Sequence, residues 1–207
     1  LDNLGTYNAT SGVLRRDTNA DGVFQAAEQT TFIAGAQFTD EPFRGDVGIL
    51  TGEEFGLYRP STGSFFFDLD DDGILDPVLG DLLFDWPAGG STVMTDWNGD
   101  GNTDLGSYVP ASGLLRRDSN GDGVFQAGEQ TDFFSIVAPV LGLTADPADQ
   151  AIAGNFNGAT VAFEFGVYRA STGQFFIDSN ANGLLDLSEA VSGGVAVVAD
   201  WDGETLT

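Results

Sequence analysis

The sequence predicts an all-β repeat protein, and three observations support this fold class. The 207 residues include 29 Gly and 17 Phe, so turns are frequent and the segments between them are rich in the aromatic residues that β-strands favour. Similar segments recur about every 50 residues, which is in the range of propeller blades. Short apolar runs alternate with Asp- and Asn-rich turns. A chain of this length can bury a substantial core.

The repeat is clearest between residues 4–32 and 105–133, where 20 of 29 positions are identical. A second pair, residues 55–76 and 165–186, shares with the first a Gly-x-Tyr strand, a Ser/Thr-Gly turn, an apolar strand and an acidic loop. We therefore interpret the chain as a single repeat domain, 1–207, of four units in the order A-B-A-B. The units cover approximately residues 1–40, 41–90, 91–138 and 150–207.

Each unit is predicted to contain four short strands. In the third unit they are expected over residues 92–95, 105–109, 114–117 and 131–137, with an acidic loop at 118–129. Two hairpins per unit at this spacing favour radial or stacked sheets over a sandwich. Two irregularities stand out: an insertion at about 138–150, and little sequence after Glu189 for an outer strand of the fourth unit.

The two ends of the chain are complementary. Residues 195–207 match residues 91–104, which supply the first strand of the third unit, and residues 2–8 match a second strand. The last segment thus supplies what the first unit lacks. This predicts a four-bladed β-propeller closed by pairing of N- and C-terminal strands. The same pairing between neighbouring subunits would instead give an open fibre, and the sequence leaves both arrangements open.

The charge balance excludes several classes of function. The chain has 32 acidic residues against seven Arg, a net charge of -25, and no Lys, His or Cys. A His base, His-ligated zinc, a catalytic thiolate, an iron–sulfur cluster and a Ser-His-Asp triad are therefore impossible. We expect no nucleic-acid partner, because phosphates repel such a surface. No apolar run reaches the ~18 residues that span a bilayer. Halophilic or very soluble proteins are equally acidic, an alternative that composition leaves open.

The strongest functional signal is the loop after the third strand of each unit. It places oxygen-bearing side chains at positions 1, 3, 5, 9 and 12 and Gly at position 6. This is the ligand spacing of a calcium-binding EF-hand loop, to which the position-7 carbonyl adds one more oxygen. The predicted ligands are Asp17, Asn19, Asp21, Gln25 and Glu28 in the first unit; Asp68, Asp70, Asp72 and Asp76 in the second; Asp118, Asn120, Asp122, Gln126 and Glu129 in the third; and Asp178, Asn180, Asn182, Asp186 and Glu189 in the fourth.

Position 12 of the second unit is Leu79, so that loop lacks its bidentate ligand unless Asp81 reaches in. The segments on both sides of each loop are predicted strands, so these are EF-hand-like loops without EF-hand helices. A single such loop is equally typical of an Asx-rich turn. Three loops that keep Glu at position 12 favour calcium.

A second type of acidic loop is predicted between the first and second strands. Its ligands in the third unit are Asp96, Asn98, Asp100 and Asp104, and Asp200, Asp202 and Glu204 form a partial copy near the end of the chain. The other two units lack the acidic spacing here. Together the two loop types predict about four to six bound Ca²⁺ ions.

Two segments carry a family resemblance. DWNGDGNTDLGSYVPASG, from residue 96, and EFGLYRPSTGSFFFDLDDDG, from residue 54, resemble FG-GAP or VCBS-type repeats, and the resemblance covers nearly the whole chain. The family implies β-propeller blades, calcium in the Asp-rich loops, an extracellular or cell-surface location, and roles in adhesion, surface assembly or glycan binding. Its calcium positions correspond to Asp96, Asn98, Asp100 and Asp104.

Three functional hypotheses follow. The first is a calcium-binding extracellular structural or adhesion module, with self-assembly into a homo-oligomer, filament or surface layer. The second is a lectin-like module that holds glycans between blades, with sugars stacked on aromatic rings; aromatics in register with a repeat are more typical of packing. The third is a hydrolase with a carboxylate pair such as Glu53 and Glu54. We rank them in this order and expect no enzyme. The candidate stacking residues are Trp86, Trp97, Trp201, Tyr7, Tyr58, Tyr108 and Tyr168.

The adjacent arginines of the A units, Arg15–Arg16 and Arg116–Arg117, are expected to pair with the surplus carboxylates. The alternative is that they form a face that meets another subunit.

Overall fold

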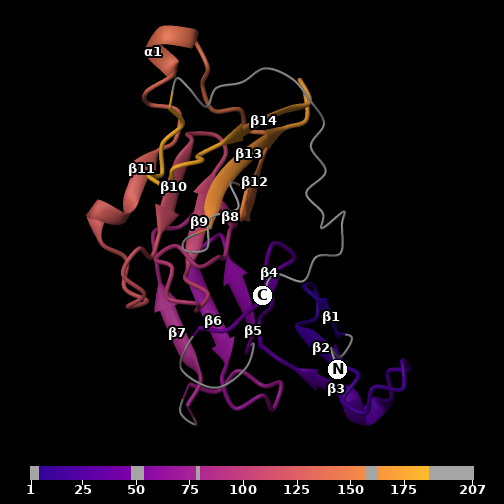
Figure 1. The fold of residues 1–207 in the computed structure, drawn as a ribbon. Helices are drawn as coiled ribbons and strands as arrows, with labels where there is room; N and C mark the ends of the chain where they lie inside the picture. Colours follow the sequence, from indigo (N-terminus) through magenta and orange to yellow (C-terminus); the bar gives the residue numbers. More distant parts are fainter. Residues whose placement is uncertain (1–4, 48–53, 78–79, 157–162, 187–207) are drawn as a thin grey trace.

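The computed structural model describes residues 5–47, 54–77, 80–156 and 163–186. They form four small antiparallel sheets of three or four strands each, joined in chain order (Figure 1). The predicted all-β fold class is therefore confirmed. Among the described residues, no helix is long and apolar enough to cross a membrane.

The two A units form sheets around the same central hairpin. In the first unit the sheet order is β1-β2-β3, and in the third it is β8-β9-β10-β11. A short 3-10 helix precedes the last strand of each sheet. The elements are β1 (Gly5–Asn8), β2 (Val13–Arg16), η1 (Ala26–Glu28) and β3 (Gln29–Thr31), then β8 (Ser91–Thr92), β9 (Gly106–Val109), β10 (Leu114–Arg117), η2 (Ala127–Glu129) and β11 (Gln130–Asp132).

The two B units also share a sheet plan. The second unit has the order β4-β5-β6-β7 and the fourth has β12-β13-β14. The residues after 186, where an outer strand of the fourth unit would fall, lie outside the described residues. The elements are β4 (Glu41–Gly45), β5 (Glu54–Arg59), β6 (Ser64–Asp68) and β7 (Leu82–Asp85), then α1 (Ala138–Leu141), β12 (Asp149–Gly154), β13 (Glu164–Arg169) and β14 (Gln174–Ile177).

The Ser/Thr-Gly dipeptide makes the same turn in every central hairpin. Its glycine has φ between 67° and 80° and donates its amide to the carbonyl four residues earlier, at 2.8–2.9 Å. Glycine adopts this left-handed conformation without steric cost, which explains why all four units have it. The glycines are Gly12, Gly63, Gly113 and Gly173.

The third unit departs from its predicted strands at both ends. The first strand was expected over 92–95, but β8 covers only Ser91–Thr92, and Thr95 forms an isolated bridge with Asp104. The last strand was expected over 131–137, but β11 ends at Asp132. The Asp132 side chain accepts a hydrogen bond from the Phe134 amide at 3.2 Å, and its carbonyl accepts one from Ser135 at 3.1 Å. This turn lets both Phe133 and Phe134 enter the core. The predicted insertion then holds α1 and the start of β12.

The hydrophobic core lies between consecutive units. One cluster joins Leu14 and Phe32 of the first unit to Leu57 of the second. The next joins the second and third units through Trp86 and Leu105. The largest cluster joins the third and fourth units. Each sheet is too small to bury an apolar face alone, so stability comes from neighbouring units, as in other repeat proteins. The largest cluster contains Val93, Trp97, Tyr108, Leu115, Phe133, Phe134, Val137, Phe165, Val167, Phe176 and Leu185.

Each B unit has one buried, bidentate Arg–Asp ion pair. Arg169 donates to both carboxylate oxygens of Asp149, each at 2.7 Å, and Arg59 bonds Asp40 in the same way at 2.7 and 2.8 Å. Both carboxylate side chains are fully buried. The Arg169 guanidinium also lies 5.0 Å from the centre of the Phe176 ring. Asp149 begins β12 and Asp40 directly precedes β4, so these pairs fix the start of the first strand of a B unit to the end of its second strand.

We predict that Arg169→Met destabilises the protein by about 3–5 kcal/mol, because it leaves the buried Asp149 carboxylate without a counter-charge. Urea denaturation would measure the loss. Arg15→Met is the matched control. Among the described residues the Arg15 side chain bonds only the exposed Gln29 side chain, so the loss there should stay below about 1 kcal/mol. Equal losses in the two variants would contradict this account of the pair.

Candidate metal centre

The acidic loops share one hydrogen-bonding scheme. In five of them, the position-1 aspartate accepts a hydrogen bond from the amide of the position-6 glycine at 2.5–2.9 Å. The side chain of position 3 accepts from the amide of position 5, and that of position 5 accepts from the amide of position 7. All these oxygens therefore face the inside of the loop. The position-1 residues are Asp17, Asp68, Asp96, Asp118 and Asp178.

The backbone of these loops turns twice through the left-handed region. Position 4 has φ between 57° and 81° and position 6 has φ between 73° and 95° in all five loops. Position 6 is always glycine, which explains its place in the repeat. Position 4 includes Ala20, Asp71 and Ala181, for which this conformation costs about 1–2 kcal/mol each. At these three residues the hydrogen bonds of the loop outweigh the preference of the backbone for negative φ.

The second unit contains the one group of three carboxylates that the described residues bring together. Oxygens of Asp68, Asp70 and Asp81 all lie within 4.8 Å of one another. Two oxygens on one Ca²⁺ are at most about 5 Å apart, because each lies ~2.3–2.6 Å from the ion. The three side chains could therefore hold one metal ion.

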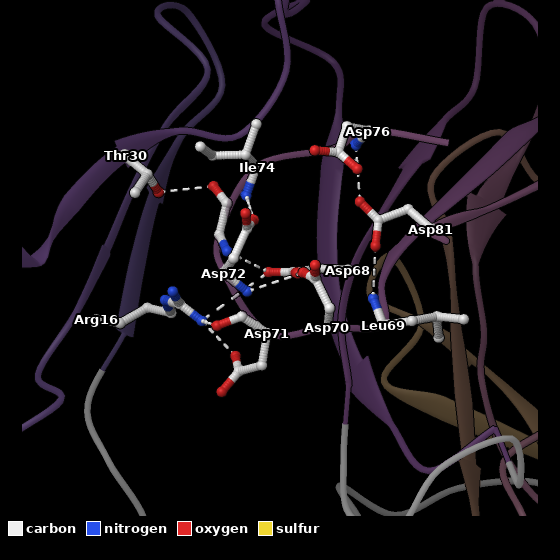
Figure 2. Close-up of polar contacts among 11 residues, drawn as sticks. Arg16, Thr30, Asp68, Leu69, Asp70, Asp71, Asp72, Ile74, Asp76 and Asp81 are labelled. Atoms are coloured by element: carbon white, nitrogen blue, oxygen red, sulfur yellow. Dashed lines mark hydrogen bonds and ion pairs between the residues drawn. The ribbon is translucent and has the colours of Figure 1, made fainter. Parts of the chain in front are cut away.

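Asp81 replaces the glutamate that this loop lacks at position 12. It accepts hydrogen bonds from the Leu69 and Asp76 amides at 2.9 and 2.7 Å (Figure 2). In the first unit, Glu28 accepts from the corresponding amides, those of Thr18 and Gln25, at 2.8 and 3.0 Å. Asp81 lies two residues further along the chain and has a shorter side chain. The two changes compensate, so both carboxylates close their loops at the same place.

Asp68 is the buried centre of this group. It is 1% exposed, and its Oδ1 has no hydrogen-bond partner among the described residues. Burial raises the pKa of Asp68 to about 6, while the Gly73 amide and Arg16 act in the opposite direction. An unpartnered carboxylate oxygen in a buried position is unfavourable. A divalent cation would supply the missing contact, so the residues present fit a metal ion.

The first and third units hold their predicted ligands in closed loops of another kind. Glu28 and Glu129 are both 8% exposed and are held by backbone amides. The bond from the Gln25 amide lowers the pKa of Glu28. The side-chain amides of the position-9 residues, Gln25 and Gln126, donate to the carboxylates of Asp21 and Asp122. Each of these loops contains three predicted carboxylate ligands, but within the described part of the chain their oxygens do not come together as those of Asp68, Asp70 and Asp81 do.

The second type of loop is formed in the third unit. Asp104 is 5% exposed and accepts hydrogen bonds from the Trp97 and Asn98 amides at 2.8 and 3.3 Å. Burial raises its pKa to about 7. A β-carbon built at Gly121 would lie 3.3 Å from an Asp104 oxygen, so this loop and loop 118–129 are in contact.

The fourth unit is described only in part. Asp178 is fully buried, and Asn180 and Asn182 donate to Asp186 at 2.8 and 3.3 Å. The predicted ligands Glu189, Asp200 and Asp202 and the partial-copy residue Glu204 lie outside the described residues.

The outer surfaces of three loops, those after the third strands of the second, third and fourth units, dock on the preceding unit. The spacing of residues in the sequence did not predict this role. The position-6 carbonyl accepts a hydrogen bond from the preceding unit at three junctions: from Thr30 to Gly73 at 2.7 Å, from Trp86 to Gly123 at 3.1 Å and from Thr131 to Gly183 at 2.8 Å. The apolar position-8 residues of these three loops, Leu75, Phe125 and Leu185, pack at the same junctions. Docking therefore requires the folded loop.

Three of the four A-unit arginines contact a neighbouring unit, whereas Arg15 bonds Gln29 of its own unit. Arg16 contacts the Asp71 carboxylate and lies 3.9 Å from Asp68, so the expected pairing with carboxylates is confirmed there. Arg117 instead donates to the Ala181 and Asn182 carbonyls at 3.0 and 3.1 Å. Arg116, 6% exposed, donates to the Pro87 carbonyl at 2.9 Å. The repeat of Arg before the acidic loop was visible in the sequence, but its partner in the next unit was not.

Comparisons with protein-family models, curated proteins and solved structures give no match to this chain. The resemblance to FG-GAP and VCBS-type repeats therefore stays a prediction from its motifs.

The junction contacts predict different effects of one substitution at two equivalent glycines. Gly73→Ala should cost more stability than Gly22→Ala, although both have φ near +80°. A β-carbon at Gly73 would lie 2.6 Å from the Thr30 hydroxyl and 2.8 Å from Arg16, whereas at Gly22 no atom lies within 4 Å. Backbone strain of about 1–2 kcal/mol is common to both, and overpacking adds about 1–3 kcal/mol at Gly73. Chemical denaturation of both variants gives the difference; equal costs would mean that the junction does not contribute.

Proposed function

We propose that this chain is a calcium-binding extracellular structural or adhesion module, in which cations bound in the acidic loops hold the stacked units together. The observation that carries the proposal is the group of Asp68, Asp70 and Asp81, in which Asp68 and Asp81 are buried and Asp68 has an unpartnered oxygen among the described residues. Calcium is the preferred candidate because all the oxygens in these loops are hard ligands, and the spacing is that of EF-hand-like loops. We expect about four to six ions.

The mechanism is linkage between metal binding and folding. A cation bound by the loop but not by the unfolded chain stabilises the folded state. In these loops the ligands face inward and the docking carbonyls face the preceding unit, so a bound ion would rigidify both surfaces. It would also offset repulsion within a chain of net charge -25. Binding in the range of about 0.1–1 mM would be that of extracellular calcium modules.

The finer architecture belongs to the same proposal. Three junctions between consecutive units repeat one docking mode, which supports a regular arrangement such as a four-bladed propeller. The segment that would close it, within 187–207, lies outside the described residues.

The lectin-like alternative loses support from the fold. Four of the seven aromatic residues proposed to stack on sugars are at most 6% exposed, so their rings serve the core and are not offered to a ligand. These four buried aromatic residues are Trp86, Trp97, Tyr58 and Tyr108.

We predict that calcium raises the melting temperature and that excess chelator lowers it. One site at a calcium concentration 100 times its Kd contributes about 2.7 kcal/mol, or roughly 5–10 °C for a domain of this size. Thermal unfolding by circular dichroism in Ca²⁺, in Mg²⁺ and in chelator would measure this. Mg²⁺ should stabilise less, because it demands smaller octahedral sites. An unchanged melting temperature with calcium and chelator would refute the proposal and leave the loops as acidic turns.

We predict that Asp81→Asn removes the calcium-dependent stability of the second loop, because it removes one of the three clustered carboxylates. The loss of stability relative to the natural chain should be about 2.7 kcal/mol at a calcium concentration 100 times the site's Kd. In chelator this loss should disappear, and only the effect of one altered hydrogen bond should remain. Asp71→Asn removes the same charge from an exposed side chain of the same loop outside the cluster. It should keep the calcium response, as isothermal calorimetry and melting curves would show. A full calcium response in Asp81→Asn would exclude this cluster as the binding site.

A further inference from the structure

One arginine of the first unit reaches the candidate metal centre of the second. Arg16 ends β2, and its Nη1 donates to the Asp71 carbonyl at 2.7 Å and also contacts the Asp71 carboxylate (Figure 2). The same nitrogen lies 3.9 Å from Oδ2 of Asp68, the most buried carboxylate of the cluster. A positive side chain from a different unit therefore stands at the edge of a group that could hold a cation.

The same arrangement recurs at the other described junction from an A unit to a B unit. Arg117 is equivalent to Arg16, and it donates to two carbonyls in the loop of the fourth unit at 3.0 and 3.1 Å. A β-carbon built at position 6 of the loop would lie 2.8 Å from Arg16 at Gly73 and 2.5 Å from Arg117 at Gly183. The guanidinium is thus a repeated part of the A-to-B junction.

The junction from the second to the third unit is built differently at this place. A β-carbon at Gly123 would meet the Phe84 ring, and the Trp86 indole donates to the Gly123 carbonyl at 3.1 Å. The loops also differ in charge, because residues 68–81 include six aspartates whereas residues 118–129 include three acidic residues. At these two junctions the guanidinium meets the more acidic loop and the aromatic rings meet the less acidic one.

A cation bound by Asp68 would lie close to the Arg16 guanidinium. Oδ1 of Asp68 has no hydrogen-bond partner among the described residues, so it is the oxygen open to an ion. Calcium lies ~2.3–2.6 Å from its ligands, which places an ion on Asp68 no more than about 8 Å from Nη1 of Arg16. At that distance, and with the dielectric constant of water, the repulsion already weakens binding about sixfold. Partial burial strengthens it, since the Arg16 side chain is 22% exposed.

We propose that Arg16 is a built-in counter-charge that sets the calcium affinity of the second unit's loop and holds that loop on the first unit when no ion is bound. It lowers the affinity because both positive charges act on the same carboxylate. Without an ion, it offsets part of the repulsion among the aspartates of the loop. The inference rests on the proposed calcium site and adds the residue that adjusts it.

Calcium titrations of the full chain and of three variants at pH 8 test this role. Arg16→Met removes the charge, and Arg16→Lys keeps it. Arg15→Met is the matched control, because it removes the same charge from the neighbouring residue, which bonds Gln29 of its own unit. Isothermal calorimetry gives the dissociation constants. Each titration is repeated in combination with Asp81→Asn, and the binding that this substitution removes belongs to the second loop.

We expect Arg16→Met to bind calcium in this loop about tenfold more tightly than the natural chain. Arg16→Lys and Arg15→Met should stay within about threefold of it, because each keeps a positive charge at position 16. In chelator the stabilities should follow the opposite order. Arg16→Met should melt roughly 5 °C or more below Arg15→Met, because it loses its contacts with Asp71. If Arg16→Met does not fold, Arg16→Gln gives the same reading and retains an N–H donor for the Asp71 carbonyl.

Three results would overturn the proposal. Unchanged calcium affinity in Arg16→Met would do so while leaving the calcium site itself in place. Equally tighter binding in Arg16→Met and Arg15→Met would show that net charge, and not the position of Arg16, sets the affinity. Absence of any calcium binding that Asp81→Asn removes would refute the metal site of the second loop, and this inference with it.

Discussion

The structure depends on the aspartate that ends the third strand of each unit. Its buried carboxylate gathers the amides of the following loop, so that the loop turns twice and brings its other oxygens inside. The same turn points the position-6 carbonyl outward, where the preceding unit donates a hydrogen bond to it. Ligand arrangement and stacking of units are therefore consequences of one local conformation. A cation in the loop would reinforce both.

The hydrogen bonds of the loops explain why seven arginines are enough for a chain with 32 acidic residues. Of the seven arginines, five lie at the junctions or in buried pairs: Arg16, Arg59, Arg116, Arg117 and Arg169. Backbone amides, and not basic side chains, compensate most loop carboxylates. Asp68 is the exception, because one of its oxygens is buried with no hydrogen-bond partner among the described residues and burial raises the pKa of Asp68 to about 6. This is the point in the described part of the chain at which three carboxylates could hold a metal ion.

The alternation of A and B units has a structural reason. A sheets offer an arginine, a threonine and a backbone carbonyl to the B loop that follows, as with Arg16, Thr30 and Phe32. At the junction from the second to the third unit, Trp86 supplies the hydrogen bond and Phe84 packs against Gly123. The junctions therefore differ in their donors while keeping one acceptor, the position-6 carbonyl.

The sequence by itself determined the strands, the Ser/Thr-Gly turns and the positions of the loop ligands. These depend on local chemistry: glycine at positive φ, aspartate side chains that bond nearby amides, and apolar runs of strand length. Only the tertiary structure decided that Asp81 closes the second loop, that Asp132 ends a strand early, and that Arg117 meets backbone carbonyls in place of carboxylates. Those outcomes depend on where the chain folds back or which unit lies alongside, and the spacing of residues within one unit does not encode such contacts.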